Sequence, residues 1–592
     1  MIRKVQLFFA NFFWLLLSVR RSYCFRASTF DVEKAQKKVL LRIIKRNRGS
    51  VFGKEHGFAS LGGIADYQAR VGVRTYDLYK GYIDCIAEGR QEILTSDPVL
   101  LLEPSSGSTA GPKYIPYNLR LYEEFKNGLS PWIFDLLSKR KRLLLGSAYW
   151  SISPITKADN KGSTIPVGFG DDAAYFGKLP GRLLNTILSV PFLVSRIEDG
   201  ESYKYVTLYF LLRDRNLAFI SVWNPSFLML LLEPLEKWSL QLIKDIERGT
   251  VTLPENSNAG LKEALIKKCY RDRKRAEELR RILAHDYAQE TGITGTKTMC
   301  ERIWPNLSLI SCWGDSHAAL HVNEIRRLFP NIEIQPKGLL ATEGIVSFPL
   351  IGESGAALSI RSHFFEFIEL KDRYENSTDA VYTKLAHQLE KGKLYSIVMT
   401  TGGGLYRYRL QDIIQVVGYK NQCPLARFIS KESNISDVAG EKLNEFHVAA
   451  ILKEAFNKYS LEPVFFLLAP ERVVKKQAYF YALFLELKEN NPGYDHCLFS
   501  LAQDLEKRLE ENYHYAHCIN LGQLLSVKLF VVNSQIPAAH IYVNTCREKG
   551  QKLGNIKPSV LSSRIGWSEY FEGRFIGESD VQGVYTCVGQ GL

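Results

Sequence analysis

The sequence predicts an α/β protein with at least two domains, and three observations support this prediction. The 592 residues exceed what one hydrophobic core usually supports. Strand-like segments at 308–314 and 332–336 alternate with helical segments such as 317–329. Past residue 430 a second series of helical and strand-like patterns begins. We therefore place a domain boundary near residue 425.

Composition and charge describe a folded protein with an excess of basic residues. Lys and Arg total 76 against 63 Asp and Glu, which gives a net charge of +13. The densest basic cluster, 267–283, is interrupted by acidic residues, and Leu279, Ile282 and Leu283 fit one helical face. A solvated helix surface explains this pattern better than a nucleic-acid site does, so we expect no nucleic-acid partner.

Cysteine usage indicates the cellular compartment. The 10 cysteines form no CxxC pair and no Cys/His grouping at metal-ligand spacing. Reduced thiols in a cytoplasmic protein explain this distribution best, although the sequence leaves oxidised pairs open.

Residues 1–30 form a separate N-terminal segment. An apolar stretch at 5–19 lies between Arg3-Lys4 and Arg20-Arg21. It is short for a membrane span, and its second basic flank is a poor ending for a signal peptide. We expect an apolar helix packed on the body of the protein. Peripheral membrane attachment is the alternative, since an aromatic helix with basic flanks can lie in the lipid interface.

Two predicted strands flank a loop of small residues. The strands are 99–104 and 113–117, and the loop between them lacks the GxxxxGK[ST] pattern of a Walker loop that opens a helix. Hydroxyls and free N–H groups in such a loop suit an anion such as phosphate. The candidate residues are Ser105, Ser106, Gly107, Ser108, Thr109, Ala110, Gly111 and Lys113.

Strand-like segments at 143–154 and 356–370 follow, and residues 395–419 form a predicted hairpin with Gly402–Gly404 at its turn.

Two further motifs carry oxygen ligands. Thr342 and Glu343, in LLATEG, follow a strand and suit Mg²⁺, a hard cation that is usually held together with phosphate oxygens. Asp412, at the end of YRYRLQD, can accept hydrogen bonds from a ribose diol. Each motif alone is weak evidence, because a Ser/Gly loop is usually a turn and Asp412 could pair with Arg407 or Arg409.

The order and the wide separation of SSGSTAGPK, ATEG and YRLQD carry more weight. With them the sequence resembles a known family, the acyl acid amido synthetases first described as auxin-responsive Gretchen Hagen proteins, within the acyl-adenylate-forming superfamily. Residues 51–58, 221–228 and 428–445 also look like that family, and the likeness extends from about residue 35 to about residue 560.

The resemblance implies a fold and an activity. It implies a large adenylate-forming domain of mixed sheets and helices at 31–425 and a smaller, mobile α/β domain at 426–592. It implies an ATP-dependent ligase that uses Mg²⁺, activates a carboxylic acid as acyl-AMP and transfers the acyl group to an amine, in this family typically an amino acid.

The resemblance also implies roles for single residues. The loop would hold the β- and γ-phosphates, Thr342 and Glu343 would flank the α-phosphate and its Mg²⁺, and Asp412 would bind ribose. Lys442 falls where the family has a lysine that swings in to the AMP phosphate, so Lys442 and Glu343 are the catalytic candidates. Lys557 sits near a second basic position of the family.

Some positions depart from the family pattern or are less specific. Gln411 stands where the family usually has Gly, and Lys431 stands where it often has Arg. A side chain at position 411 could crowd the ribose turn. Tyr149, Trp150 and Trp223 are candidates for contact with the acid substrate, with core packing as the alternative for each.

Two other functions remain open at this point. The same chemistry could deliver the acyl group to a thiol, as in acyl-CoA ligases. A non-catalytic interaction protein could also retain the fold, and the joint presence of Lys113, Glu343, Asp412 and Lys442 argues against this second alternative.

Overall fold

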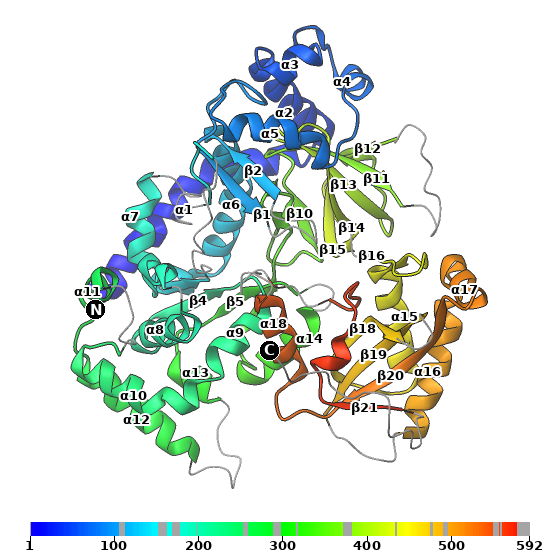
Figure 1. Ribbon diagram of the computed structural model, residues 1–592. Coiled ribbons are helices and arrows are strands. Elements are labelled where there is room, and N and C mark those ends of the chain that lie inside the picture. The colour runs from blue at the N-terminus through cyan, green and yellow to red at the C-terminus, as the bar shows by residue number, and fades with distance from the viewer. Residues whose placement is uncertain are drawn as a thin grey trace. The chain divides into compact units, whose positions relative to one another are not determined.

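The chain forms two compact units in the computed structural model (Figure 1). Unit 1 comprises Met1–Ile429 and Gln551–Lys557, and unit 2 comprises Ser430–Gly550 and Pro558–Leu592. The return of residues 551–557 to unit 1 was not expected from the sequence, which indicates one boundary only. The structure describes residues 2–105, 113–151, 163–168, 178–197, 199–252, 259–287, 298–314, 318–370, 382–432, 435–473, 478–488, 495–548, 556 and 559–576.

The largest sheet of unit 1 has seven strands and is largely antiparallel. Its order is β12-β11-β13-β14-β15-β10-β9, and it shares a hydrophobic core with helices from the first part of the chain. The expected strand at 356–370 is two strands, β10 and β11, and the expected hairpin at 395–419 is β13 and β14. The bounds are β9 Ser347–Pro349, β10 Ala356–Leu358, β11 Phe364–Glu369, β12 Lys384–Leu385, β13 Leu394–Thr400, β14 Tyr408–Lys420 and β15 Cys423–Lys431.

A second sheet of unit 1 is parallel and has the order β3-β4-β5-β6. Its strands are β3 Ser147–Trp150, β4 Leu217–Ser221, β5 Leu309–Cys312 and β6 Glu333–Pro336. The strand expected at 143–154 begins at Ser147, because residues Lys141–Leu145 form a 3-10 helix before β3, and residues 152–154 of the prediction lie outside the described residues. Parallel strands need crossover connections, and helices between the strands of this sheet supply them.

Side-chain caps define where several helices begin. The Asp31 carboxylate accepts a hydrogen bond from Lys34 N (3.0 Å), and the Asn118 side chain accepts from Arg120 N and Leu121 N (3.1 and 2.9 Å). The helices of unit 1 are α1 Ile2–Ser28, α2 Val32–Asn47, α3 Val51–Glu55, α4 Ile64–Arg70, α5 Asp77–Ala87, α6 Leu119–Lys139, α7 Lys178–Ile187, α8 Gly200–Arg213, α9 Pro225–Leu232, α10 Leu235–Arg248, α11 Ala259–Ile266, α12 Arg273–Tyr287, α13 Met299–Ile303 and α14 Ala318–Leu328.

The N-terminal helix α1 packs on the body of unit 1, as the sequence predicts. It lies against α6, α7 and the 3-10 helix that precedes β3. Asn11 Nδ2 donates to the carbonyls of Leu143, Leu144 and Gly146 at 3.1, 3.2 and 2.9 Å. An ion pair between Arg21 and Glu123 (2.7 Å) holds the later part of the helix.

Two short hairpins complete unit 1. Strands β1 (Leu101–Ser105) and β2 (Lys113–Tyr117) pair antiparallel, with Ser105 opposite Lys113. This confirms the two predicted strands, and residues 106–112 between them lie outside the described residues. Strands β7 (Leu340–Ala341) and β8 (Gly344–Ile345) form the second hairpin.

Unit 2 has its own sheet and its own hydrophobic core. The sheet order is β18-β19-β20-β21, and a two-stranded hairpin, β16-β17, precedes it in the chain. The bounds are β16 Ile435–Ser436, β17 Leu443–Asn444, α15 Glu445–Lys458, β18 Pro463–Val473, β19 Ala478–Leu487, α16 Asp495–Leu509, α17 Tyr513–Asn520, β20 Leu524–Val532, α18 Ala538–Glu548 and β21 Gly573–Phe575.

Candidate active site

The first candidate motif lies at the end of the β1-β2 hairpin. Ser105 and Lys113 are half-buried there, while Ser106, Gly107, Ser108, Thr109, Ala110 and Gly111 lie outside the described residues. Lys113 Nζ lies 5.8 Å from the centroid of the Tyr76 ring, and the Tyr76 hydroxyl accepts a hydrogen bond from Tyr114 N (2.8 Å). Tyr76 therefore joins this hairpin to the start of α5.

The second motif is the turn of the β7-β8 hairpin. Thr342 and Glu343 are the two turn residues, and the Tyr117 hydroxyl donates to the carbonyl of Thr342. The Glu343 side chain is 8% exposed, and its Oε1 accepts a hydrogen bond from the Tyr408 hydroxyl at 3.3 Å. A carboxylate held this way has a defined position.

A buried polar network supports this turn from behind. His363 Nε2 accepts a hydrogen bond from Ile345 N (3.1 Å), so the proton of the neutral ring is on Nδ1, which donates to Glu124 (2.9 Å). A Cβ atom at Gly344 would lie 2.6 Å from His363 Nε2, which explains why the motif ends in Gly. Glu124 also accepts from Gly402 N (2.9 Å), which connects the network to the turn between β13 and β14.

The third motif contains a bulge in β14 that places Asp412. Ser396 of β13 pairs with Ile413 of β14, and Val398 pairs with Arg409. Two residues along β13 therefore correspond to four along β14, so β14 has two extra residues here. Bulges of this kind redirect side chains beside active sites. Asp412 is 3% exposed, and its Oδ1 has no hydrogen-bond partner among the described residues. A buried carboxylate oxygen of this kind is available to accept from a ligand hydroxyl.

Gln411 adopts φ of +62° in this bulge, the left-handed region where Gly is favoured. We therefore expect Gln411→Gly to raise the free energy of unfolding by about 0.5–1 kcal/mol, because it removes the backbone strain of a non-Gly residue. Urea denaturation of the two proteins measures the difference.

Gln415→Gly in the same strand is the matched control. Gln415 has no positive φ, so this change is expected to lower stability by about 1 kcal/mol. A loss of stability in both variants would contradict the account of Gln411.

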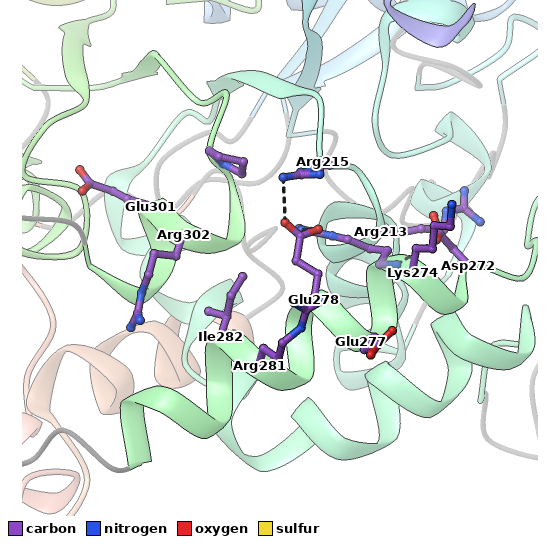
Figure 2. A pocket seen from close by; sticks show the side chains of 12 residues that line it. Arg213, Arg215, Asp272, Lys274, Glu277, Glu278, Arg281, Ile282, Glu301 and Arg302 are labelled. Atoms are coloured by element: carbon purple, nitrogen blue, oxygen red, sulfur yellow. Dashed lines mark hydrogen bonds and ion pairs between the residues drawn. The ribbon is translucent and has the colours of Figure 1, made fainter. Parts of the chain in front are cut away.

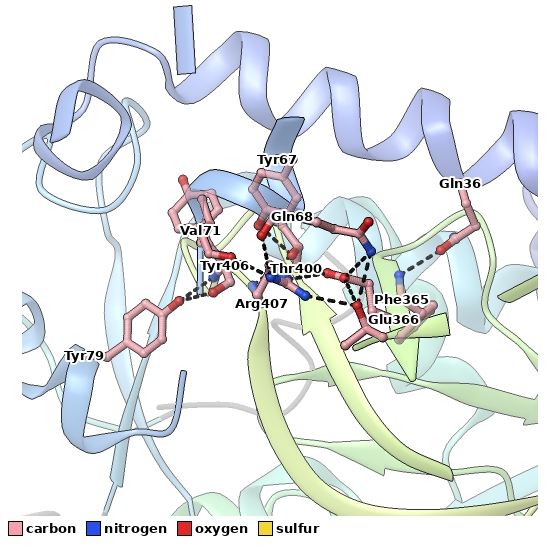
Figure 3. A network of polar contacts seen from close by, with 11 residues as sticks. Gln36, Tyr67, Gln68, Val71, Tyr79, Phe365, Glu366, Thr400, Tyr406 and Arg407 are labelled. Carbon is pink, nitrogen blue, oxygen red and sulfur yellow. Dashed lines mark hydrogen bonds and ion pairs between the residues drawn. The ribbon is translucent and has the colours of Figure 1, made fainter. Parts of the chain in front are cut away.

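Arg407 takes part in a buried network of its own and does not pair with Asp412 (Figure 3). Its Nε donates to Glu366 (3.0 Å), and its other nitrogens donate to the carbonyls of Gln68 and Val71 (2.9 and 2.6 Å) and to the Thr383 hydroxyl (3.0 Å). This network ties α4 and the sheet to the beginning of β14.

Tyr408 connects the second and third motifs, and sequence analysis missed it. Burial raises the pKa of Tyr408, and the nearby carboxylates of Glu343 and Asp412 and the Tyr76 ring add to that increase. Tyr117, at the end of the β1-β2 hairpin, donates to Thr342, and Tyr408 donates to Glu343, so hydrogen bonds of two tyrosines connect all three motifs. A tyrosine at the start of the strand that carries Asp412 was the available signal, because it shares a strand with a candidate ligand.

The three aromatic candidates have different surroundings. Tyr149 is 1% exposed and belongs to the core between the parallel sheet and helices such as α8. Trp150 is half-buried on the other face of β3, beside Trp132 (ring centroids 5.9 Å apart). Trp223 is half-buried after β4, beside Trp313 (5.9 Å). Trp150 and Trp223 thus lie near the carboxyl ends of parallel strands, where α/β sheets bind ligands.

Lys337, which sequence analysis also missed, lies between tryptophans at the same edge of the sheet. Its Nζ donates to Ser221 Oγ (2.7 Å) and lies 5.2 and 4.9 Å from the ring centroids of Trp132 and Trp223. Burial among these rings lowers the pKa of Lys337 to about 7. The available signal was a lysine directly after a strand and shortly before Thr342.

In unit 2, Lys442 is exposed on the turn between β16 and β17. The buried Glu441 carboxylate fixes this turn, because it accepts from Val438 N (2.9 Å), Ala439 N (2.8 Å) and the Tyr481 hydroxyl. Lys557 lies outside the described residues. Its neighbour Ile556 accepts a hydrogen bond from Asn224 Nδ2 (2.7 Å) within unit 1.

A charged pocket elsewhere on unit 1 involves the basic stretch at 267–283 (Figure 2). Its charges are largely paired within the protein. Arg215 pairs with Glu278 (3.2 Å), and the buried Arg275 donates to the carbonyls of Leu212 and Ile303 (2.8 and 2.6 Å). In α12, Leu279 is buried while Arg273, Lys274, Arg280 and Arg281 are exposed, so the solvated helix surface is confirmed for this part of the stretch.

The described residues contain no group of three or more His, Cys, Asp and Glu side chains that could hold a metal ion. The described cysteines, nine in number, are all free thiols.

Comparisons with known proteins give consistent results over nearly the whole chain. The model of the GH3 family N-terminal domain matches residues 22–334, and that of the GH3 family central domain matches residues 356–431. Indole-3-acetic acid-amido synthetase GH3.17 of Arabidopsis thaliana is 24% identical, with 93% of this chain and 94% of that protein covered. Jasmonoyl–L-amino acid synthetase GH3.5 of Oryza sativa subsp. japonica is 22% identical, with 73% and 76% covered.

A solved structure supports the fold class. The structure of GH3.15 acyl acid amido synthetase aligns with a TM-score of 0.74 at 19% identity, covering 93% of this chain and 94% of that one. The α/β fold predicted from the sequence is therefore confirmed.

Proposed function

Because this chain belongs to the GH3 family, we propose that it is an AMP-forming ligase that activates a carboxylic acid with ATP and transfers the acyl group to an amine. The relatives' names, which describe synthetases that conjugate acids to amino acids, support an amino acid as the acceptor. The observation that carries the proposal is that hydrogen bonds of Tyr117 and Tyr408 connect three motifs that are distant in the sequence, and that Oδ1 of the buried Asp412 has no hydrogen-bond partner among the described residues.

The reaction proceeds in two steps. A carboxylate oxygen of the acid attacks the α-phosphorus of ATP, pyrophosphate leaves, and an acyl-AMP anhydride forms. The amine then attacks the acyl carbon, AMP leaves, and the amine loses a proton. The protein has to stabilise the charge that develops on the phosphoryl oxygens, which is chiefly a matter of positioned positive charge and N–H donors.

Each described motif has a part in this chemistry. The Lys113 ammonium, at the end of the loop hairpin, faces the phosphates, and Asp412 accepts hydrogen bonds from the ribose hydroxyls. Glu343, whose position is set by Tyr408, lies at the α-phosphate.

Glu343 also suits a magnesium ion that arrives with the nucleotide. A single buried carboxylate fits Mg²⁺, which commonly takes one or two carboxylates and completes its shell with phosphate oxygens and water. The ion would supply positive charge to the phosphates.

We propose that Lys337 binds the carboxylate of the acid substrate. The ammonium has one hydrogen bond to Ser221 among the described residues, lies five positions before Thr342, and has indole rings on two sides. Trp132 and Trp223 would then contact the apolar part of the acid.

Lys337→Met is expected to raise the KM for the acid by about 10- to 100-fold, because it removes a charged hydrogen bond to the carboxylate. The pKa of Lys337 in the protein without bound acid is about 7. The acid is therefore bound tightly at pH values below 7, and its KM rises as the pH increases above 7 and the ammonium loses its proton. Cys312 is the titratable neighbour that interacts with this ammonium. Steady-state kinetics from pH 6 to about pH 9 measure both effects.

Lys391→Met, at an exposed turn of unit 1, is the matched control and should leave the KM unchanged. Lys337→Arg keeps its charge over this pH range and should flatten the pH dependence. An acid KM that is the same in wild type and Lys337→Met at every pH would refute the assignment.

We further propose that Lys442 serves the AMP phosphate after a movement of unit 2, and that the enzyme acts in the cytoplasm. Two observations support the first proposal. Residues 440–445, GEKLNE, resemble the family segment that carries the C-terminal lysine, and Glu441 fixes the turn that carries Lys442. The free thiols among the described residues support the second.

ATP–pyrophosphate exchange with pools of aryl, alkyl and fatty acids tests the function. Exchange that depends on an acid is expected, and mass spectrometry with mixed amino acids or coenzyme A then distinguishes an amide from a thioester product. No exchange with any pool, together with no thermal shift on adding Mg-ATP, would favour the non-catalytic interaction protein.

A further inference from the structure

The outward face of α1 carries large apolar side chains that stay exposed beside the described residues of unit 1. They are Ile2, Val5, Phe9, Phe12, Phe13 and Leu16, which we call the apolar stripe. Apart from the adjacent Phe12 and Phe13, they are spaced three or four residues apart, which places them on one side of the helix. Phe9 and Leu16 are 63% and 51% exposed. The stripe therefore exposes a continuous apolar surface about 20 Å long at a rise of 1.5 Å per residue.

The inward face of the same helix mixes polar and apolar side chains. Asn11, Ser18 and Ser22 are buried against the body together with Leu7, Ala10 and Phe25, and Asn11 donates to three backbone carbonyls there. An ordinary amphipathic helix exposes its polar side. Along the stripe α1 instead exposes large apolar side chains and buries the amide of Asn11, which indicates that the outward face functions in an apolar medium.

The charge of α1 identifies that medium. The first acidic residue of the chain is Asp31, so α1 contains no Asp or Glu but does contain Arg3, Lys4, Arg20, Arg21 and Arg26. Arg3, Lys4 and Arg20 are exposed at the two ends of the stripe. An aromatic stripe with basic flanks matches the acyl chains and anionic headgroups of a membrane surface.

A second copy of this chain fits the stripe less well. Antiparallel pairing of two stripes would bring Arg20 of one copy near Arg3 and Lys4 of the other, and parallel pairing would bring identical charges together. Like charges at an interface are unfavourable, and this chain already carries a net charge of +13.

The contacts of the inward face determine how the helix meets the bilayer. By length and composition α1 is the one helix in the described part of the chain that could span a membrane, and 22% of its most apolar window is buried. Spanning would break the three Asn11 hydrogen bonds and the Arg21–Glu123 ion pair. A helix that stays on the body can only lie along the lipid surface.

We propose that the apolar stripe of α1 docks the folded enzyme on an anionic membrane surface, with α1 parallel to the bilayer. This goes beyond the proposed ligase reaction and does not depend on it.

Flotation of the full-length protein with lipid vesicles tests the proposal. Wild type is expected to bind phosphatidylcholine vesicles that contain about 30 mol% phosphatidylserine, and to bind them less at about 0.5 M salt than at about 0.1 M. Phe9→Asp/Leu16→Asp should reduce the bound fraction by about tenfold or more, because two apolar side chains no longer enter the lipid. Lys4→Glu/Arg20→Glu should abolish the preference for anionic vesicles.

Leu240→Asp is the matched control, since Leu240 is an apolar side chain of α10 with 75% exposure, and it should bind like wild type. Thermal melting checks that every variant folds. Failure of wild type to float with anionic vesicles, or unchanged binding of Phe9→Asp/Leu16→Asp, would overturn the proposal. So would a wild-type dimer in sedimentation equilibrium that Phe9→Asp/Leu16→Asp converts to a monomer. ATP–pyrophosphate exchange without lipid should be unaffected by the stripe variants, which separates this test from that of the ligase.

Discussion

Glu343→Gln is expected to lower the rate of acid-dependent ATP–pyrophosphate exchange by about 100- to 1000-fold, the range seen when one preorganised electrostatic group is removed from a catalytic site. The amide keeps the shape of the side chain and a partner for the Tyr408 hydroxyl, but it loses the negative charge that suits a magnesium ion. Initial rates of pyrophosphate exchange, at saturating acid and nucleotide, measure this effect.

Two further variants make the test specific. Glu390→Gln removes an exposed carboxylate of unit 1 and should leave the exchange rate unchanged. Tyr408→Phe removes only the hydroxyl that contacts Glu343, and a loss of about fivefold is expected for one hydrogen bond. An exchange rate within tenfold of wild type in Glu343→Gln, with unchanged thermal melting, would show that Glu343 does not act on the nucleotide.

Arg407→Met is expected to destabilise unit 1 by about 3–5 kcal/mol, because it leaves the fully buried Glu366 carboxylate without its cationic partner. The carbonyls of Gln68 and Val71 also lose a donor. Urea unfolding followed by tryptophan fluorescence measures the loss in unit 1, where all tryptophans except Trp567 lie. A free energy of unfolding of Arg407→Met that is less than about 1 kcal/mol below that of wild type would contradict a strong contribution from the buried ion pair.

A double-mutant cycle separates the ion pair from the other contacts of Arg407. Arg407→Met combined with Glu366→Gln should be less destabilised than the sum of the two single variants, since each single variant leaves a lone buried charge and the double variant leaves none. Arg140→Met is the control, because its ion pair with Glu333 is half-exposed and is expected to contribute less than about 1 kcal/mol.

The sequence identified some of the candidate site residues and missed others. Ser105, Glu343 and Asp412 stood in short motifs whose residue types match nucleotide chemistry, so their roles could be predicted without coordinates. Tyr76 and Lys337 stood in no such motif, and Tyr408 stood in YRLQD without a role of its own. Their importance depends on contacts between segments about 40 to 120 residues apart, and such contacts leave no local pattern.

Local departures from the sequence prediction have similar causes. The strand predicted to start at residue 143 starts at Ser147, because residues Lys141–Leu145 form a 3-10 helix in which the carbonyls of Leu143 and Leu144 accept hydrogen bonds from Asn11 of α1. Gln411 was expected to crowd a turn, and the structure adds that it adopts a left-handed conformation within a bulge.

The sequence by itself determined the α/β class, the family, the β1-β2 strand pair and the presence of an apolar N-terminal helix. These depend on residue type and spacing, which are local properties. Only the tertiary structure decided that hydrogen bonds of Tyr117 and Tyr408 connect the three motifs, that Arg407 pairs with Glu366, and that α1 turns its apolar stripe outward. The physical reason is that burial, pairing and the direction of a helical face are properties of neighbours in space, and the chain order does not specify those neighbours.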